Sequence, residues 1–514
     1  MYVRLLVLSL VLGVALVSGV ASASADSVEE TVVRFEPGDG DVEDLKLHAR
    51  ESQEGLRELS RDSEDVEVVR SFWISNAVLV NASDDGREAI RELDGVVDLH
   101  PNYEFKPVDD HVDARDGELD EGDPDEIGHV EEDGYAVDWG VDAIDATSVW
   151  NETRGEGARV AVLDTGVDAS HPDVDLYSDD PDDPSYPGGW AEFNSSGERV
   201  SSEPYDGGLH GTHVSGKVAG GNASDVGIGV APDVELLNAK VFDVGGSFAQ
   251  INAGMEWAVE RDVDVMSLSF GVECEEENWY VSRMVEPVRN AVAADVVVVA
   301  SSGNEGVGCS SSPGNVFDTF AVGAVDRFDR VPSFSSGMTV NTTEAWGDDA
   351  PEDWPDSYVV PDVVAPGVEI TSAVPGGYRQ LDGTSTAAPH VAGAAALVVS
   401  AHPEASASEV VEALENSTSK PDDAPDEMDE RWGRGVIDVQ EAVGDLEEED
   451  DEVEDDGVRD NETEGNGTDD GVNETDGGNE TDGGDDGETQ PAPGVLAVLL
   501  AVFGLAFVRR LRER

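Results

Sequence analysis

The strongest constraint on the fold is a set of four continuous apolar runs between residues 135 and 446. They read ARVAVLDTG, VELLNAKVF, VDVMSLSFG and DVVVVASSGN. A strand with one face in water alternates apolar and polar residues, whereas these runs are apolar on both faces, as in a parallel sheet covered on both sides. Helical patterns accompany them over residues 213–220, 248–261, 282–294 and 385–400. The alternation predicts an α/β domain with a doubly wound, mostly parallel sheet, whose sites form at the carboxyl ends of strands.

Shorter segments flank this domain. Residues 26–107 have the pattern of a small α+β unit, with helical patterns over 44–61 and 84–93. Residues 108–134 are acidic and poor in apolar residues, which predicts a linker. Residues 447–491 are a low-complexity acidic stalk with repeated Asn-x-Thr triplets, which are glycosylation acceptors.

Both ends of the chain have the composition of targeting segments. Residues 1–25 carry one early arginine, an apolar core and Ala-x-Ala sites, and they predict a signal peptide of the general secretion route. Residues 492–514 are an apolar segment followed by four arginines. The segment is just long enough for a membrane span, and its basic end is expected to stay cytoplasmic. We therefore predict a secreted protein that is anchored at the cell surface by its C-terminus.

The charge of the chain is strongly one-sided. Its 514 residues include 114 Asp and Glu but only 30 Lys and Arg, for a formal net charge of −84. This charge excludes nucleic acid as a partner, and at low salt it makes the compact form repel itself. At molar salt the Debye length falls to about 3 Å, which screens that repulsion. The composition predicts a halophilic, salt-requiring protein.

Three strand ends carry residues for acyl-transfer chemistry, and each has an alternative interpretation. Asp164 in VAVLDTGVD also fits an aspartic protease, but no second Asp-Thr-Gly occurs, so that enzyme would have to be a homodimer. His210 in HGTHVSG could form a metal pair with His213, yet the His-Glu-x-x-His pattern of zinc proteases is absent. We interpret His213 as a packed neighbour. Ser385 in DGTSTAAPHVAG could be an ordinary helix N-cap, with Pro389 in the first helical turn.

Attack by a serine needs a hydroxyl, an imidazole base, a carboxylate that holds the imidazole, and donors for the oxyanion. The motifs VLDTGVD, HGTHVSG and GTSTAAPHVAG supply these groups in the order Asp, His, Ser. In this order the chain resembles the subtilisin-like serine proteases (subtilases) over residues 135–445. The resemblance implies that Asp164 orients His210, that His210 is the general base, and that Ser385 is the nucleophile.

The same resemblance implies further functional residues. The side chain of Asn304 and the backbone N–H of Ser385 would form the oxyanion hole. The walls of the primary specificity pocket would be two segments, Ser269-Phe270-Gly271 and Ala300-Ser301-Ser302-Gly303. Residues 26–107 resemble the family's inhibitory propeptide, whose last strand occupies the cleft, and self-cleavage would fall before about residue 135. The expected catalytic domain spans residues 135–446.

The chain has two cysteines, Cys274 and Cys309. They could form a disulfide, which an extracellular location permits, or remain two free thiols. The resemblance places them just beyond the two pocket walls, which favours a disulfide.

Four features depart from the family pattern. Thr386 follows the nucleophile where the family usually has Met, and a Thr cannot form a sulfoxide. Lys217 stands where a small or hydroxyl residue is common. The calcium site is reduced to Asp173 and either Asn222 or Asp225 as candidate side-chain ligands, whereas a Ca²⁺ ion takes six to eight oxygens. The C-terminal end resembles archaeal sorting segments but carries Pro-Gly-Val instead of Pro-Gly-Phe.

Together these features predict a monomeric, self-processed endopeptidase of a halophilic archaeal secreted type. Its substrates would be proteins and peptides, and its own propeptide would be its inhibitor. The chemistry would need no cofactor, and Ca²⁺ could bind as a structural ion. Two alternatives are a narrow processing protease of surface proteins and an idle adhesion or surface-layer protein on a protease scaffold.

Overall fold

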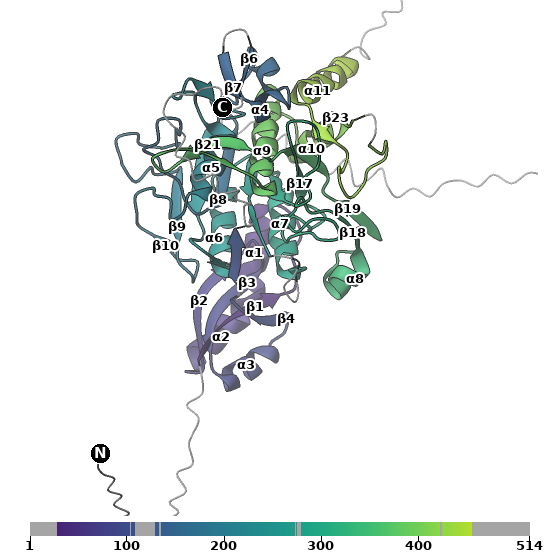
Figure 1. The fold of residues 1–514 in the computed structure, drawn as a ribbon. Coiled ribbons are helices and arrows are strands. Elements are labelled where there is room, and N and C mark those ends of the chain that lie inside the picture. Colours follow the sequence, from purple (N-terminus) through teal and green to yellow (C-terminus); the bar gives the residue numbers. More distant parts are fainter. Residues whose placement is uncertain are drawn as a thin grey trace, which may run out of the picture.

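The computed structural model describes residues 28–102, 104–107, 129–132, 135–272, 274, 279–421 and 424–454. It consists of a small N-terminal domain, purple in Figure 1, and a larger α/β domain. The predicted signal peptide, most of the linker and stalk, and the predicted anchor lie outside the described residues. No helix within the described ranges is long and apolar enough to cross a membrane.

The larger domain contains a ten-stranded sheet in the order β10-β9-β12-β8-β14-β16-β17-β20-β24-β23. Neighbours from β9 to β24 are parallel, and only the edge strands β10 and β23 pair antiparallel. The strand bounds are β8 Arg159–Asp164, β9 Trp190–Phe193, β10 Arg199–Val200, β12 Glu235–Lys240, β14 Val265–Leu268, β16 Val297–Ser301, β17 Phe320–Val325, β20 Val363–Pro366, β23 Thr418–Ser419 and β24 Val436–Ile437. The four predicted apolar runs became β8, β12, β14 and β16, so the predicted α/β class and parallel sheet are confirmed.

Helices cover both faces of this sheet. Val160 and Val162 of β8 pack into one core together with residues of α5 and α9, whereas Ala161 and Leu163 pack into a second core with residues of α6 and α7. Because successive side chains of a strand point to opposite faces of the sheet, a continuous apolar run places apolar side chains in both cores. The helix bounds are α5 His210–Ala219, α6 Phe248–Val259, α7 Val285–Ala293, α9 Thr384–Ala401, α10 Ala407–Asn416 and α11 Val439–Glu454. Helix α11 therefore continues beyond the predicted domain boundary at residue 446.

The N-terminal domain is an antiparallel sheet in the order β2-β3-β1-β4 with three helices. Its elements are β1 Glu29–Phe35, α1 Val42–Ser52, α2 Glu54–Asp62, β2 Val66–Phe72, β3 Ala77–Ala82, α3 Asp84–Arg91 and β4 Val96–Pro101. One helix was predicted over residues 44–61, but the structure has two helices that meet at Gln53. The sheet packs on α6 and α7 of the larger domain through a shared apolar core that includes Phe72, Ile74 and Leu79.

Two segments connect the domains. Strand β5 (Glu104–Pro107) pairs antiparallel with β13 (Gly246–Ser247) and with β15 (Phe270–Gly271) of the larger domain. Further along, β6 (His129–Glu132) and β7 (Tyr135–Asp138) form a hairpin, and β7 pairs with β11 (Val226–Gly227). The predicted linker thus ends in a strand of the larger domain. The short helices α4 (Trp139–Asp142) and η2 (Ala146–Val149) follow.

The remaining elements lie between the sheet strands. They are η3 Ser282–Met284, β18 Met338–Asn341, α8 Thr342–Trp346, η4 Gly347–Asp349, β19 Ser357–Val360, β21 Ile370–Val374 and β22 Gly377–Leu381. The hairpin of β18 and β19 encloses α8 and η4, and the sequence patterns did not predict it. Trp346 and Trp354 of this insertion are buried and pack edge to face. Both belong to the same apolar core as residues of α6 and α7, which attaches the insertion to the domain.

Candidate active site

Asp164 and His210 are joined at the carboxyl end of the central sheet. Asp164 is the last residue of β8, and its carboxylate is fully buried. The Nδ1 atom of His210 lies 2.8 and 2.9 Å from the two carboxylate oxygens, and the backbone N–H of Thr165 donates to the same carboxylate at 2.7 Å. An ionised carboxylate in this position fixes the imidazole tautomer with the proton on Nδ1.

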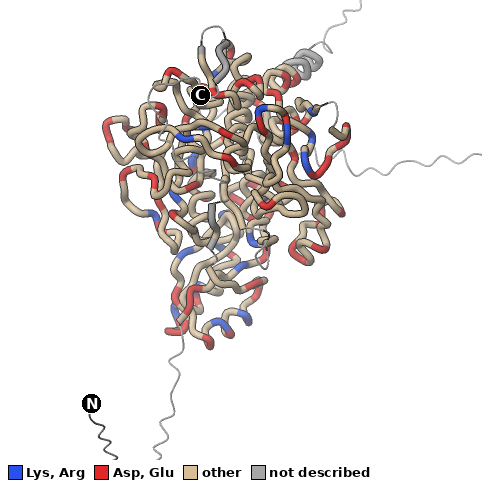
Figure 2. Tube along the Cα trace, in the orientation of Figure 1, with Lys and Arg blue, Asp and Glu red and all other residues tan. Residues whose placement is uncertain are grey.

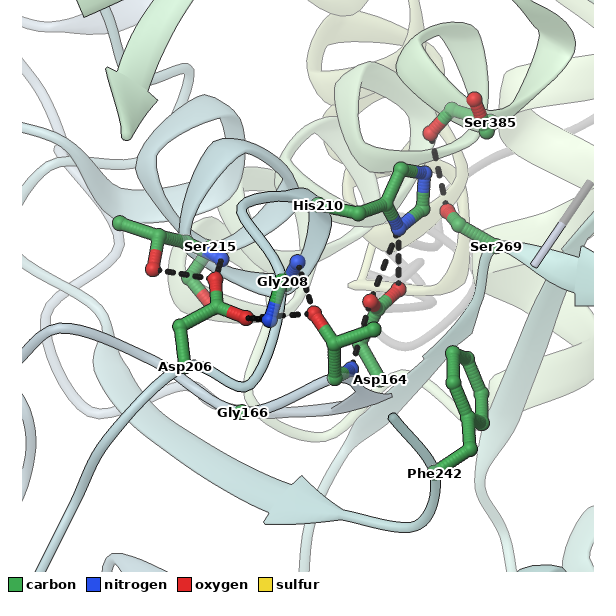
Figure 3. A network of polar contacts seen from close by, with 12 residues as sticks. Asp164, Gly166, Asp206, Gly208, His210, Ser215, Phe242, Ser269 and Ser385 are labelled. Atoms are coloured by element: carbon green, nitrogen blue, oxygen red, sulfur yellow. Dashed lines mark hydrogen bonds and ion pairs between the residues drawn. The ribbon is translucent and has the colours of Figure 1, made fainter. Parts of the chain in front are cut away.

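Ser385 lies on the other side of the His210 ring from Asp164 (Figure 3). It is the second residue of α9 and is buried. The three predicted residues, from three distant parts of the chain, therefore meet in one place. The positive end of the α9 dipole is at the hydroxyl of Ser385, where it favours developing negative charge.

The prediction that Pro389 lies in the first turn of its helix is wrong, because α9 already begins at Thr384. A proline inside a helix has no N–H for the carbonyl four residues earlier, which here is the carbonyl of Ser385. The hydroxyl of Ser269 donates to this carbonyl at 2.9 Å instead. Ser269 thus holds the backbone of Ser385, in addition to its position at the predicted pocket wall.

Asn304 lies beside the start of α9, and its amide oxygen accepts two hydrogen bonds from Thr384. The donors are the backbone N–H and the hydroxyl of Thr384, each at 2.9 Å. The same hydroxyl accepts from the backbone N–H of Gly303 at 3.2 Å. Because the oxygen of Asn304 is held toward α9, the amide nitrogen is the end of the side chain that can donate to a substrate oxygen.

Asp206 links segments around the candidate site, and the sequence patterns did not reveal it. Its Oδ1 atom accepts from the Thr165 hydroxyl at 2.7 Å, and its Oδ2 atom accepts from the backbone N–H and hydroxyl of Thr212 at 2.8 and 2.6 Å. The Thr165 hydroxyl in turn accepts from the backbone N–H of Gly211 at 2.9 Å. This network, drawn in Figure 3, ties the residue after Asp164 to the residues after His210. The only sequence signal was an acidic residue just before the HGTH motif.

The two predicted pocket walls lie close together, and β5 lies against one of them. Phe270 and Gly271 pair with β5, and the rings of Phe105 and Phe270 meet edge to face with centroids 6.3 Å apart. Ser311, which the sequence patterns did not indicate, lies between the walls. A methyl group added at Gly271 would meet the Ser311 Cβ atom at 2.8 Å, and one added at Gly303 would meet the Ser311 hydroxyl at 2.6 Å.

Cys274 and Cys309 form a disulfide with Cα atoms 5.6 Å apart. Cys274 follows the wall that ends at Gly271, and Cys309 follows the wall that ends at Gly303. The bond therefore links the segments that leave the two walls.

The candidate calcium ligands do not form a cage. The carboxylate of Asp173 accepts hydrogen bonds from the backbone N–H of Ala223 and, at 2.6 Å, from the Tyr378 hydroxyl. The side chain of Asn222 is exposed. Within the part of the chain that the structure describes, no three His, Cys, Asp or Glu side chains lie together as metal ligands would. Asp173 therefore closes its loop with hydrogen bonds.

His213 is the packed neighbour that the sequence predicted. It is fully buried, and its Nε2 atom lies 3.1 Å from the carbonyl oxygen of Ile370 and 3.2 Å from that of Arg379. Burial, with a smaller effect from Lys217, lowers the pKa of His213 to about 3. The ring is neutral near pH 7.

Comparison with known proteins identifies the family. A model described as "Subtilase family" matches residues 155–446, which is more than half of the chain. This chain belongs to the subtilase family. It is 35% identical to subtilisin E of Bacillus subtilis (strain 168) over 332 residues, 62% of this chain and 75% of that protein. It is 32% identical to an alkaline protease of Alkalihalobacillus alcalophilus over 426 residues, 80% of this chain and 92% of that protein.

Membership of the subtilase family makes this protein a serine endopeptidase. Acyl transfer through a serine needs no cofactor for the chemistry itself. The match to the alkaline protease extends well beyond the subtilase domain of residues 155–446.

Proposed function

We propose that this subtilase is a secreted, salt-requiring endopeptidase that processes its own precursor and is held at the cell surface, with Asp164, His210 and Ser385 as its catalytic triad. The observation that carries the proposal is the His210 ring, which is bonded to the buried Asp164 carboxylate through Nδ1 and has Ser385 on its other side. With the proton on Nδ1, Nε2 is the unprotonated ring nitrogen and can act as the general base.

In the acylation step, the Ser385 oxygen attacks the carbonyl carbon of the scissile bond while His210 Nε2 takes the hydroxyl proton. The negative charge moves to the substrate oxygen, where the Asn304 amide and the Ser385 backbone N–H donate to it. His210 then gives its proton to the leaving amine as the C–N bond breaks. Water repeats the sequence on the acyl-enzyme and releases the acid, which restores the Ser385 hydroxyl.

Self-processing is supported by the position of the N-terminal domain. Strand β5 lies between β13 and β15, where it pairs with Phe270 and Gly271 in the manner of an extended peptide added to two strand edges. Residues 26–107 would act as a propeptide whose last strand blocks the substrate cleft. Cleavage would fall in residues 108–128, because β6 and β7 already belong to the larger domain.

Secretion and surface attachment rest on the composition of residues 1–25 and 492–514, and the salt requirement rests on the net charge of −84. Figure 2 shows Asp and Glu spread over the part of the chain that the structure describes, so the repulsion between them is not confined to the acidic stalk.

The full chain and its Ser385→Ala variant, both expressed in molar salt, test the proposal. The wild type is expected to release the N-terminal domain and to hydrolyse casein, and the variant is expected to do neither. Ser400→Ala is a matched control, because Ser400 lies near the far end of the same helix and donates to the carbonyl of Glu156. Equal processing and hydrolysis by Ser385→Ala and the wild type would disprove the proposed mechanism.

A further inference from the structure

Lys217 is a fully buried lysine that the proposed mechanism does not use. It lies on α5, seven residues and thus about two turns after His210. Its side chain is fully buried, and its Nζ atom lies 2.9 Å from Oδ1 of Asp138, whose side chain is also fully buried. A buried lysine is costly unless its charge is neutralised by a partner.

Asp138 connects Lys217 to the segment that leads into the catalytic domain, residues 135–142, called the lead-in segment below. The Asp138 carboxylate accepts from the backbone N–H of Gly140 at 3.2 Å, which caps α4. It also accepts from the backbone N–H of Thr371 on β21 at 3.3 Å. One carboxylate therefore joins α5, the lead-in segment and the β21–β22 hairpin.

The lead-in segment also packs tightly against the helix of Ser385. A methyl group added at Gly140 would lie 2.4 Å from Nε2 of His390, which is on α9 five residues after Ser385. His390 is fully buried, and its Nδ1 atom lies 2.9 Å from the carbonyl oxygen of Thr386. Only a glycine permits this approach, so the contact between α4 and α9 has little tolerance for movement.

The other titratable groups next to Lys217 are neutral. Burial, and in second place the charge of Lys217, lowers the pKa of His390 far below its usual range and the pKa of His213 to about 3. Both histidine rings are therefore uncharged near pH 7. The ion pair with Asp138 is thus what compensates the Lys217 charge among the described residues around it.

We propose that Asp138 and Lys217 are positioning residues, which set the helix of His210 against the helix of Ser385 through the lead-in segment. This inference rests on the proposed function of the triad. Lys217 fixes α5 along its axis, and Asp138 holds α4 in the position where Gly140 contacts α9. A shift of about 1 Å between a base and a nucleophile can reduce the rate about 10²-fold.

The inference is tested with three variants of the full chain in molar salt. Asp138→Asn removes one charge of the pair. Asp138→Glu keeps the charge but moves it by one methylene group. The double variant Asp138→Leu/Lys217→Met replaces the pair with apolar side chains of similar volume. The matched control is Lys420→Met/Asp429→Leu, because Asp429 also binds a lysine at 3.0 Å and two backbone N–H groups, away from the triad.

The expected result separates stability from rate. Asp138→Asn is expected to lower the melting temperature by about 10 °C, and the double variant is expected to restore most of that loss. All three variants are expected to lower kcat at least tenfold at temperatures well below their melting points, with KM nearly unchanged. The control is expected to keep the wild-type kcat.

Two outcomes count against the inference. If the double variant recovers both melting temperature and kcat, the pair is only structural. If the double variant does not fold, Asp138→Glu decides, and a wild-type kcat in it overturns the positioning role. A wild type that hydrolyses no casein is a different failure, because it contradicts the proposed function itself.

Discussion

Thr165 lies at the centre of the contacts that hold the proposed catalytic pair. Its hydroxyl donates to Asp206 and accepts from Gly211, and its carbonyl accepts from the Lys240 ammonium at 2.9 Å and from the backbone N–H of Gly207 at 3.0 Å. Since Thr165 follows Asp164 directly, its position determines where the Asp164 carboxylate lies. We therefore expect the Thr165 side chain to affect catalysis through the position of Asp164.

Thr165→Val is expected to lower kcat about tenfold or more with little change in KM, because it leaves the buried Gly211 N–H without its partner and leaves Asp206 Oδ1 with only the Gly208 N–H. Each lost partner costs roughly 1–3 kcal/mol. Thr165→Ser keeps the hydroxyl and is expected to keep kcat. The measurement combines kinetics on a peptide substrate with the low-field proton NMR signal of His210 Nδ1–H. A normal rate and signal in Thr165→Val would contradict the prediction.

Thr386 is buried next to the nucleophile, and its hydroxyl donates to the Gly383 carbonyl at 2.9 Å. Because a threonine has no thioether to oxidise, the enzyme is expected to retain its activity in hydrogen peroxide. Thr386→Met is expected to lose activity progressively in the same peroxide concentration. Residual hydrolysis is measured over time for both proteins, and equal inactivation rates would contradict the prediction.

At the scale of elements, the disulfide links the segments beyond the two predicted pocket walls. Replacing Cys274 and Cys309 by Ser removes a covalent loop with a sequence separation of 35 residues. The chain-entropy model predicts a loss of about 3–4 kcal/mol in the free energy of unfolding. Since the walls would then move more independently, KM is expected to rise more than kcat falls. Thermal unfolding and peptide kinetics measure the two effects, and unchanged values of both would contradict this role.

Docking of the N-terminal domain involves two buried groups that respond to pH with opposite signs. Glu256 on α6 accepts from the backbone N–H groups of Trp73 and Ile74 and pairs with Arg70 at 3.5 Å. Burial raises the pKa of Glu256 to about 7, so the docked state binds more protons than the separated state as pH falls from 7 to 4.5, and docking strengthens.

His100 on β4 has the opposite effect. It packs edge to face on Phe248 of α6, and burial, followed by the nearby Arg283, lowers its pKa to about 3. The docked state therefore binds fewer protons below pH 6.5, and docking weakens as pH falls through that window.

Glu256→Gln should isolate the effect of His100. In this variant, docking is expected to weaken about tenfold for each pH unit below 6.5, whereas in the wild type the two effects largely cancel. The measurement is the retention of the cleaved N-terminal domain by the catalytic domain between pH 7 and 5. Adding His100→Phe to this variant is expected to remove the pH dependence. A flat pH profile in Glu256→Gln alone would disprove the proposed effect of His100 on docking.

For the whole molecule, the net charge of −84 predicts that salt stabilises the folded state. The Debye length shortens from about 10 Å at 0.1 M to about 3 Å at 1 M, so repulsion between the Asp and Glu residues, red in Figure 2, falls steeply over this range. The melting temperature is expected to rise between 0.2 and 3 M NaCl. Sucrose at equal osmolality, which adds no ions, is the control, and an equal rise with sucrose would contradict an electrostatic cause.

The core elements could be predicted because their signals are local. The apolar runs around residues 160, 237, 266 and 298 are strands in the structure, and the helices between them follow the same short-range patterns. The insertion at residues 338–360 could not be predicted, since its aromatic core exists only when Trp346 and Trp354 meet. The break between α1 and α2 at Gln53 was missed because Gly55 is the only local signal near it, and a single Gly is also tolerated inside a continuous helical pattern.

The sequence by itself determined the α/β class, the family, and the identity of Asp164, His210, Asn304 and Ser385 as candidates, because apolar periodicity and short motifs are written in consecutive residues. The tertiary structure decided which groups support them. These groups make contacts between segments that are distant in the chain. Asp206 accepts from Thr165, the Ser269 hydroxyl donates to the Ser385 carbonyl, and Asp138 pairs with Lys217. A hydrogen bond depends on distances of about 3 Å in space, and sequence spacing does not contain those distances.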